Sequence, residues 1–168
     1  MIFQIAGLPR SGTAWAASIL NLCPDIICVH EPPDVNVPVP SGLYRHSGES
    51  GSHLLVKDYR DRHADLRVFI KRDNEHCYNS TRILFDEELT RESWDTKLTP
   101  MAIDYEKGAD IVISFDKLFS LDTIKYLWKE ISDSPFDDDK VSLLLNMNIQ
   151  RESFEYDFEP EFVASLNL

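Results

Sequence analysis

The sequence has little of what marks a secreted, membrane-spanning or polyanion-binding protein. It has only three cysteines, too few for a disulfide framework: Cys23, Cys28 and Cys77. No apolar run approaches the roughly 20 residues that span a bilayer, and the first residues lack the basic segment and cleavage site of a signal peptide. Basic residues are scarce too. Seventeen Lys and Arg stand against 29 Asp and Glu, and the net charge of −12 disfavours nucleic acid. We therefore expect a cytoplasmic protein with reduced cysteines and neither a membrane nor a nucleic-acid partner.

The chain has enough apolar residues for a core. Of its 168 residues 43% are hydrophobic, so we expect one globular domain over residues 1–168. Short apolar runs predict strands, and longer segments of helical composition predict helices. The expected strands are 2–6, 26–29, 53–57, 67–71 and 111–115, and the expected helices are 13–22, 75–85, 99–107 and 121–131. Proline and glycine predict an irregular loop over 32–52, and the last residues, about 150–168, are expected to form a tail.

The segment GLPRSGTAW, residues 7–15, follows the first expected strand. Gly7 and Gly12 have the spacing of the phosphate-binding loop G-x-x-x-x-G-K-[ST], but Thr13 stands where that loop has lysine. Glycines let backbone amides approach an anion, and the following helix directs its positive end at it. Arg10 can supply the missing cation from inside the loop. Together with the alternating strands and helices, the loop predicts an α/β fold: a single P-loop-type domain of three layers, in which helices flank a mainly parallel central sheet.

Two more polar residues belong to a later junction between strand and helix. Arg72 follows the strand expected at 67–71, and Ser80 lies within the next expected helix. Because the carboxyl ends of parallel strands share one edge of a sheet, we expect both side chains to face the same crevice as the glycine loop.

The stretch PRSGTAW resembles the 5′-phosphosulfate-binding loop of sulfotransferases, P-[KR]-S-G-T-[TS]-[WL]. These enzymes use 3′-phosphoadenosine 5′-phosphosulfate (PAPS). VFIKRDNEHCYNS resembles the family's second motif, an arginine at a strand end with a serine eight residues later, although Asn74 stands where the family has proline. The resemblance implies a PAPS site in which Arg72 and Ser80 bind the 3′-phosphate. It also implies that the 5′ side is bound by Pro9, Arg10, Ser11, Gly12, Thr13, Ala14 and Trp15.

The likeness extends over about residues 1–131, because IVISFDKLFS and LLVKDYRDRHADLRVFIKRD also resemble family segments in the same order. The glycine-rich RKGxxG loop of cytosolic members is missing, as it is in carbohydrate-modifying members. The implied reaction moves a sulfuryl group from PAPS to a hydroxyl or amine of a small-molecule or carbohydrate acceptor. It leaves adenosine 3′,5′-bisphosphate (PAP) and needs no metal. The chain is short, so loop 32–52, the tail or a second copy in a homo-oligomer is expected to enclose the acceptor.

Sulfuryl transfer depends on positioning and on stabilising the negative charge of the leaving phosphate oxygen, and a base must take the acceptor's proton. Arg10 is the candidate cation. The base is expected at the end of the second strand, in IICVHEPP, where His30 and Glu31 stand. Carbohydrate-modifying members of the resembled family often carry E-P here, and aryl and steroid enzymes use a histidine from elsewhere. Glu31 is therefore favoured over His30. Lys57, at the end of the strand expected over 53–57, is a further candidate for contacting sulfate or acceptor.

Two other functions stay open. A P-loop kinase or nucleotide-binding module would use Mg-ATP, and Asp116 after IVISF is the nearest candidate for its metal ligand. A non-catalytic binder of PAPS or PAP would keep the same loop. A phosphatase is disfavoured, because HCYNSTR leaves four residues between Cys77 and Arg82, one fewer than the H-C-x-x-x-x-x-R loop, and has the composition of a helix.

Overall fold

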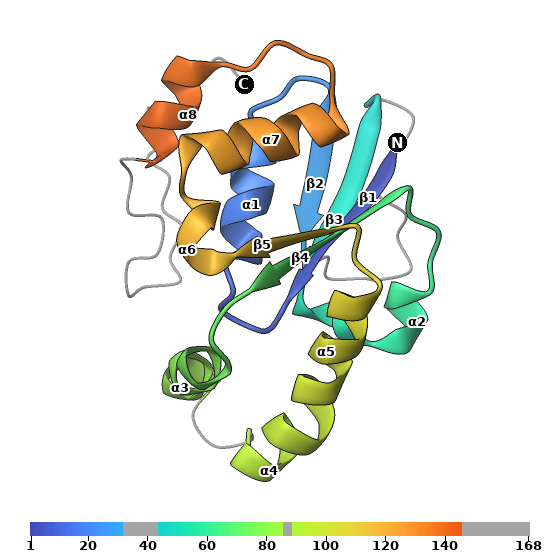
Figure 1. Ribbon diagram of the computed structural model, residues 1–168, viewed down its shortest axis with the longest axis vertical. Coiled ribbons are helices and arrows are strands. Elements are labelled where there is room, and N and C mark those ends of the chain that lie inside the picture. The colour runs from blue at the N-terminus through green and yellow to red at the C-terminus, as the bar shows by residue number, and fades with distance from the viewer. Residues whose placement is uncertain (32–43, 86–88, 146–168) are drawn as a thin grey trace.

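The computed structural model describes residues 1–31, 44–85 and 89–145 and is built around a sheet of five parallel strands (Figure 1). The order across the sheet is β2-β3-β1-β4-β5. The strands span Ile2–Gly7 (β1), Ile26–His30 (β2), His46–Gly51 (β3), Leu66–Lys71 (β4) and Ile111–Ser114 (β5). Because each pairing is parallel, all strands end at one edge, the carboxyl edge of the sheet. This confirms the expected α/β fold with a parallel central sheet.

Helices cover both faces of the sheet and give the expected three layers (Figure 1). The first face carries α1 (Thr13–Leu20), α6 (Phe115–Leu118), α7 (Leu121–Ile131) and α8 (Asp138–Leu145). The second face carries the 3₁₀ turn η1 (Ser52–Leu55), α2 (Lys57–Arg60), α3 (Asn74–Phe85), α4 (Arg91–Ser93), the π-helical segment η2 (Trp94–Leu98) and α5 (Thr99–Lys107). Strand residues alternate between the faces. In β1, Phe3 and Ile5 join the core of the first face, whereas Ala6 joins the core of the second.

Three helices form where the sequence predicts them. Helix α7 buries one apolar stripe at helical spacing, Ile124, Leu127, Trp128 and Ile131. Pro100 lies in the first turn of α5, where its missing N–H costs no helical hydrogen bond. The carboxylate of Asp73 accepts a hydrogen bond from the His76 amide at 2.9 Å and so caps the start of α3.

The prediction of a strand over 53–57 is wrong, and so is the prediction of irregular loop throughout 32–52. The third strand is instead HSGESG, which forms β3 inside the expected loop. β3 lies between β2 and β1, where little room is left for a side chain. A Cβ on Gly48 would come within 2.2 Å of the Phe3 ring. A polar, glycine-containing strand carries little of the apolar, β-branched signal on which strand prediction depends.

The segment HLLVK forms a helical turn rather than a strand. Leu54 and Leu55 are both buried in the core of the second face, whereas consecutive residues of a strand would point to opposite faces. Lys57 then begins α2 as an exposed residue and does not end a strand.

Two expected features lie outside the described residues: the part of the irregular loop over 32–43 and the tail over about 150–168. Their contribution to an acceptor site stays a prediction. Within the part of the chain that the structure describes, no helix combines the length and apolarity needed to cross a membrane.

Candidate functional site

The turn between β1 and α1, residues 8–12, has a constrained backbone. Arg10 has φ 69° and Gly12 has φ 92°, both in the left-handed region. This conformation is uncommon for any residue other than glycine and marks a strained position. Gly7 must also lack a side chain, because a Cβ there would lie 2.1 Å from the hydroxyl oxygen of Ser11. The glycines predicted from the motif are thus required by the geometry of the turn.

The turn and the start of α1 carry two buried hydroxyl side chains. Ser11 is fully buried, and its hydroxyl has no hydrogen-bond partner among the described residues. Thr13 is buried at the first position of α1, and Ala14 follows it, half-buried. Among the described residues no side chain caps the first turn of α1, so the amides there have no side-chain acceptor. A phosphate group fits this combination of free amides and an unpartnered buried hydroxyl.

Trp15 supports the turn from within the core. It is 5% exposed, and its ring packs edge-on against Phe119 with 4.8 Å between the ring centres. Pro9 is half-buried at the start of the turn. That either residue touches a ligand stays a prediction.

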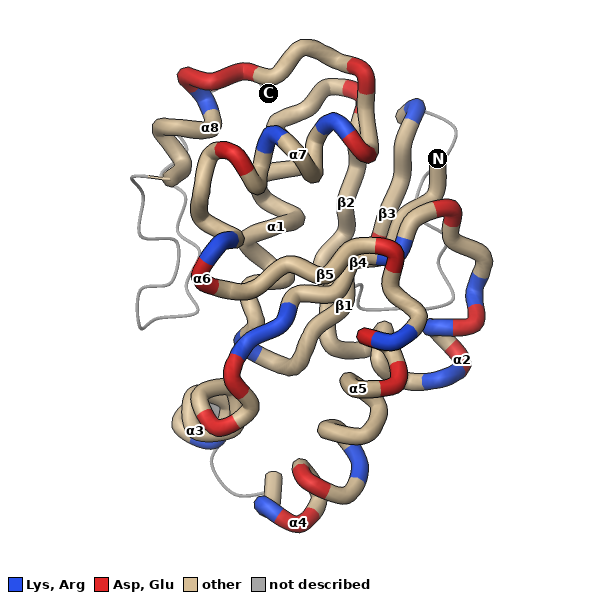
Figure 2. Tube along the Cα trace, in the orientation of Figure 1, with Lys and Arg blue, Asp and Glu red and all other residues tan. Residues whose placement is uncertain are grey.

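The residues predicted for the second phosphate lie directly beside the turn. Nε of Arg10 donates a hydrogen bond to the Ser80 hydroxyl at 3.2 Å. Nη1 of Arg72 donates to the carbonyl oxygen of Arg10 at 2.5 Å, and the Arg72 guanidinium lies 4.0 Å from the centre of the Phe115 ring. In Figure 2 the basic end of β4 leads into α3. The structure therefore brings together two parts of the site that were predicted from separate motifs.

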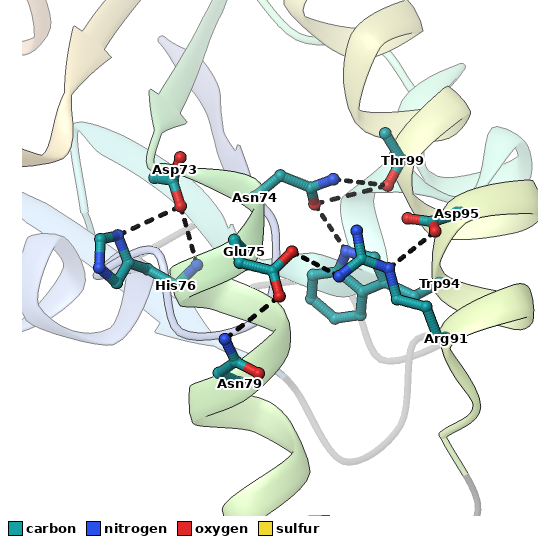
Figure 3. Close-up of polar contacts among 9 residues, drawn as sticks. All are labelled: Asp73, Asn74, Glu75, His76, Asn79, Arg91, Trp94, Asp95 and Thr99. Carbon is teal, nitrogen blue, oxygen red and sulfur yellow. Dashed lines mark hydrogen bonds and ion pairs between the residues drawn. The ribbon is translucent and has the colours of Figure 1, made fainter.

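The helix that carries Ser80 is anchored at its start (Figure 3). Nε1 of Trp94, in η2, donates a hydrogen bond to the side-chain oxygen of Asn74 at 2.6 Å. Arg91 adds an ion pair with Glu75 in the first turn of α3. Asn74, which stands where the resembled motif has proline, thus ties α3 to η2 and fixes the direction in which α3 leaves the carboxyl edge.

Glu31 follows β2 at the same edge and also has a left-handed backbone, with φ 43°. Its carboxylate accepts hydrogen bonds from the amide of Ser52 at 3.3 Å and from its hydroxyl at 2.8 Å. His30 precedes it, with Nδ1 3.1 Å from the Ser50 hydroxyl oxygen, and burial of part of the ring lowers the pKa of His30. Since β3 separates β2 from β1, Glu31 lies two strand spacings, roughly 10 Å, from the line of β1.

Sequence reasoning missed His53, which lies in the 3₁₀ turn η1. It follows β3, the immediate neighbour of β1. Its Nε2 is 3.4 Å from the carboxylate of Glu49, and its Nδ1 is buried with no partner among the described residues. Glu31 and His53 converge on Gly51, because a Cβ there would lie 2.6 Å from Cγ of Glu31 and 2.7 Å from Nδ1 of His53. Placing a strand over 53–57 hid this histidine, since the first residue of a strand belongs at the opposite edge.

Two other sequence candidates lie apart from this group. Asp116, the nearest candidate for a magnesium ligand, is exposed on α6 after β5, and β4 separates β5 from β1. Within the described residues, no group of three or more His, Cys, Asp or Glu side chains is placed to hold a metal ion. Cys77 lies inside α3, where burial raises the pKa of its thiol to about 11. A cysteine phosphatase needs the thiolate, so this position does not suit one.

Comparison with known proteins bears on the fold. No protein-family model matches the sequence, and no curated protein matches it. Among solved structures, the mouse sulfotransferase SULT7A1 complexed with PAP matches with a TM-score of 0.55 and 14% identity, over 85% of this chain and 62% of that chain. Shikimate kinase from Bacteroides thetaiotaomicron matches with a TM-score of 0.41 and 13% identity, over 77% of this chain and 95% of that one. An uncharacterized protein from Eubacterium ventriosum matches with a TM-score of 0.43 and 12% identity, over 77% and 98%.

The likeness to the sulfotransferase structure and the parallel sheet define the class: the chain has a P-loop-like α/β fold. The likeness to the sulfotransferase, at 14% identity, shows the fold alone, and this chain spans less than two thirds of that structure's length.

Proposed function

We propose that the protein is a sulfotransferase that moves a sulfuryl group from PAPS to a hydroxyl or amine acceptor. The observation that carries the proposal is the meeting of Arg10, Arg72 and Ser80 at the carboxyl edge of the sheet. A nucleotide with both a 5′- and a 3′-phosphate needs two neighbouring cationic positions, and the two arginines supply them. The resemblance of PRSGTAW and VFIKRDNEHCYNS to sulfotransferase motifs supports the same function.

The turn fits the 5′ side of PAPS, which supplies an activated sulfuryl group when bound. Ser11 offers its unpartnered hydroxyl, and the amides at the start of α1 offer donors. Arg10 offers a charge that it keeps at any working pH. We assign to Arg10 the stabilisation of the negative charge that develops on the leaving oxygen. Because arginine gives up a proton with difficulty, its role is electrostatic rather than that of a proton donor.

Two groups compete for the role of the base that takes the acceptor's proton. Glu31, with His30 as its support, is the assignment from sequence. His53 is the addition from the structure, because Glu49 holds one ring nitrogen and the other is unpartnered. A carboxylate that orients a histidine is a common arrangement for general bases. The proposed acceptor is a small molecule or a carbohydrate, and a second copy of the chain in a homo-oligomer is one candidate for enclosing it.

A thermal-shift comparison tests the function. PAP fills both phosphate positions, whereas ATP lacks the 3′-phosphate, so PAP is expected to stabilise the fold more than Mg-ATP does. At a hundred times its dissociation constant PAP contributes about 2.7 kcal/mol, which for a chain of this size raises Tm by very roughly 5–10 °C. EDTA should leave the shift unchanged, because the arginines take the place of the cation that a kinase draws from magnesium.

Two outcomes would reject the proposed sulfotransferase activity. A larger shift with Mg-ATP than with PAP, abolished by EDTA, would identify a kinase-like module. A shift with PAP but no transfer from radiolabelled PAPS to any of a panel of phenols, alcohols, amines and sugars would point to a non-catalytic binder.

A further inference from the structure

Arg72 contacts the proposed phosphate-binding turn directly, and this contact is separate from any contact that Arg72 makes with a ligand. Its Nη1 donates to the carbonyl oxygen of Arg10 at 2.5 Å. This hydrogen bond runs from the end of β4 to the one non-glycine residue of the turn 8–12 with a left-handed backbone. A charged donor on a carbonyl is among the stronger hydrogen bonds in a protein. The bond therefore opposes the return of Arg10 to the ordinary right-handed region, which would redirect this carbonyl.

A second contact holds the Arg72 guanidinium in place. It lies 4.0 Å from the centre of the Phe115 ring, within the range of a cation–π interaction. The same ring lies against the turn, because a Cβ on Gly12 would be 3.3 Å from Phe115. Gly12 is the second left-handed residue of the turn. Arg72 thus contacts one left-handed position through a hydrogen bond, and Phe115 packs against the other together with Leu118.

A third contact joins the turn to α3. Nε of Arg10 donates to the Ser80 hydroxyl at 3.2 Å. The side chain of Arg10 is therefore tied to the helix that follows Arg72, and the backbone of Arg10 is tied to Arg72. A movement of the junction between β4 and α3 cannot leave the turn unaffected.

From these contacts we infer that Arg72 is a positioning residue for the 5′-phosphate turn as well as a contact for the 3′-phosphate. The two phosphate positions are consequently not independent. Loss of Arg72 weakens the binding of a nucleotide that has only a 5′-phosphate, although such a ligand has no group for the 3′ position. The inference rests on the phosphate-binding part of the proposed function, but its structural half concerns the ligand-free protein and can be measured alone.

The experiment compares Arg72→Ala with Lys71→Ala, a matched control that removes the same charge from the neighbouring residue. Lys71 is exposed and pairs with Glu106 at 2.7 Å, away from the turn. Calorimetry gives the affinities for AMP, with its single 5′-phosphate, and for PAP. Arg72→Ala should weaken both by about tenfold or more, the effect of losing one charged hydrogen bond. Lys71→Ala should change both by much less.

Hydrogen exchange in the ligand-free protein separates positioning from direct contact. The amide of Ser11 donates to the carbonyl oxygen of Leu8 at 3.0 Å, so its exchange rate reports the closed turn. Arg72→Ala should speed exchange of the amides of residues 10–12, and Lys71→Ala should not. Arg72→Lys keeps one donor for the Arg10 carbonyl and should restore part of both the protection and the AMP affinity. Phe115→Leu keeps all charges, removes the ring from Arg72 and should speed exchange in the same direction.

The results distinguish this inference from the function on which it rests. Unchanged exchange in Arg72→Ala, with weaker PAP but unaltered AMP binding, would overturn the positioning role and leave the sulfotransferase proposal intact. A wild-type protein that binds neither nucleotide would reject the function, while faster exchange in Arg72→Ala would still establish the positioning role. If Arg72→Ala does not fold, Arg72→Lys and Phe115→Leu give the same two readouts.

Discussion

At the scale of single residues, two of the catalytic candidates have a strained backbone conformation. Among the described residues other than glycine, only Arg10 and Glu31 have a positive φ. Each such position costs free energy, of the order of 1–3 kcal/mol, and persists only where the surroundings impose it. Arg10 was chosen as a catalytic candidate because it stands in a glycine loop that lacks lysine. Glu31 was chosen because it follows a strand and matches a segment of the resembled family, and neither reason concerns backbone strain. The conformation is therefore an independent reason to look for function at these two positions.

Replacement of Arg10 by alanine should slow transfer by about a hundredfold or more, the usual loss when one donor to a transition-state charge is removed. Arg10→Lys keeps the charge and should retain part of the rate, although it loses the bond from Nε to Ser80. The measurement is turnover of radiolabelled PAPS with the best acceptor of a panel. Turnover near the wild-type level in Arg10→Ala would remove this residue from the mechanism.

The base can be identified from three substitutions that keep size and remove basicity: Glu31→Gln, His53→Gln and His30→Asn. The variant that loses its base should turn over slowly while its affinity for PAP stays close to normal, because the base faces the acceptor. If His53 is the base, Glu49→Gln should also slow turnover, since Glu49 holds the ring. Activity lost only in Glu31→Gln would return the role to the residue chosen from sequence, and activity lost only in His30→Asn would transfer it there.

At the scale of elements, secondary structure is best predicted from sequence where a helix or strand buries one apolar face. Helix α7 forms over its predicted residues because its apolar stripe has helical spacing. β3 was missed because it is the strand with least apolar character: Ser47 and Ser50 are buried, and Gly48 lies against an aromatic ring. Packing between two neighbouring strands decides this segment, and no window of the sequence contains that information.

The position of Gly48 gives a stability prediction. Gly48→Ala would place a Cβ 2.2 Å from the Phe3 ring, so either the ring or the strand must move. Overpacking of this kind costs about 1–3 kcal/mol of unfolding free energy. Gly108→Ala is the matched control, because its φ of −99° suits alanine and its Cβ would meet nothing closer than 3.8 Å. Gly108→Ala should change the free energy of unfolding by less than about 1 kcal/mol.

Denaturant unfolding of both variants gives the comparison. Equal midpoints for Gly48→Ala and the wild type would mean that Phe3 moves aside freely and that β3 is not tightly packed on β1.

At the scale of the whole molecule, the site depends on strand order. The sequence placed Arg10 in the loop after the first strand, Arg72 at the end of a later strand and Ser80 in the helix that follows it. The rule that parallel strands share a carboxyl edge was enough to predict that they lie together. It did not show that β3 lies between β1 and β2. That arrangement sets Glu31 two strands from β1, whereas His53 lies in the 3₁₀ turn that follows β3, the strand next to β1. Strand order depends on contacts between distant segments, so this part of the site required the structure.

His46 begins β3 at the amino edge of the sheet, and its burial makes the stability of the fold sensitive to acid. Both ring nitrogens of His46 are buried without a partner among the described residues. Burial, followed by the nearby α-amino group of Met1 and by Arg45, lowers the pKa of His46, although Asp25 and Asp133 act in the other direction. The unfolded chain takes up this proton near pH 6.5, about the ordinary value for histidine, and the folded protein only at lower pH. Over that interval the unfolded state binds more protons, so stability falls as the pH falls.

His46→Phe keeps the shape of the ring and removes the proton site. Between about pH 7.5 and about pH 5.5, the fall in Tm should therefore be smaller in this variant than in the wild type. His30, whose pKa is also lowered, contributes to the acid sensitivity of both proteins and cancels in the comparison. His63→Gln, at an exposed histidine near Asp65, serves as the control and should fall as the wild type does. An equal fall in His46→Phe and the wild type would show that the folded protein protonates His46 as readily as the unfolded chain, and that the acid sensitivity has its source elsewhere.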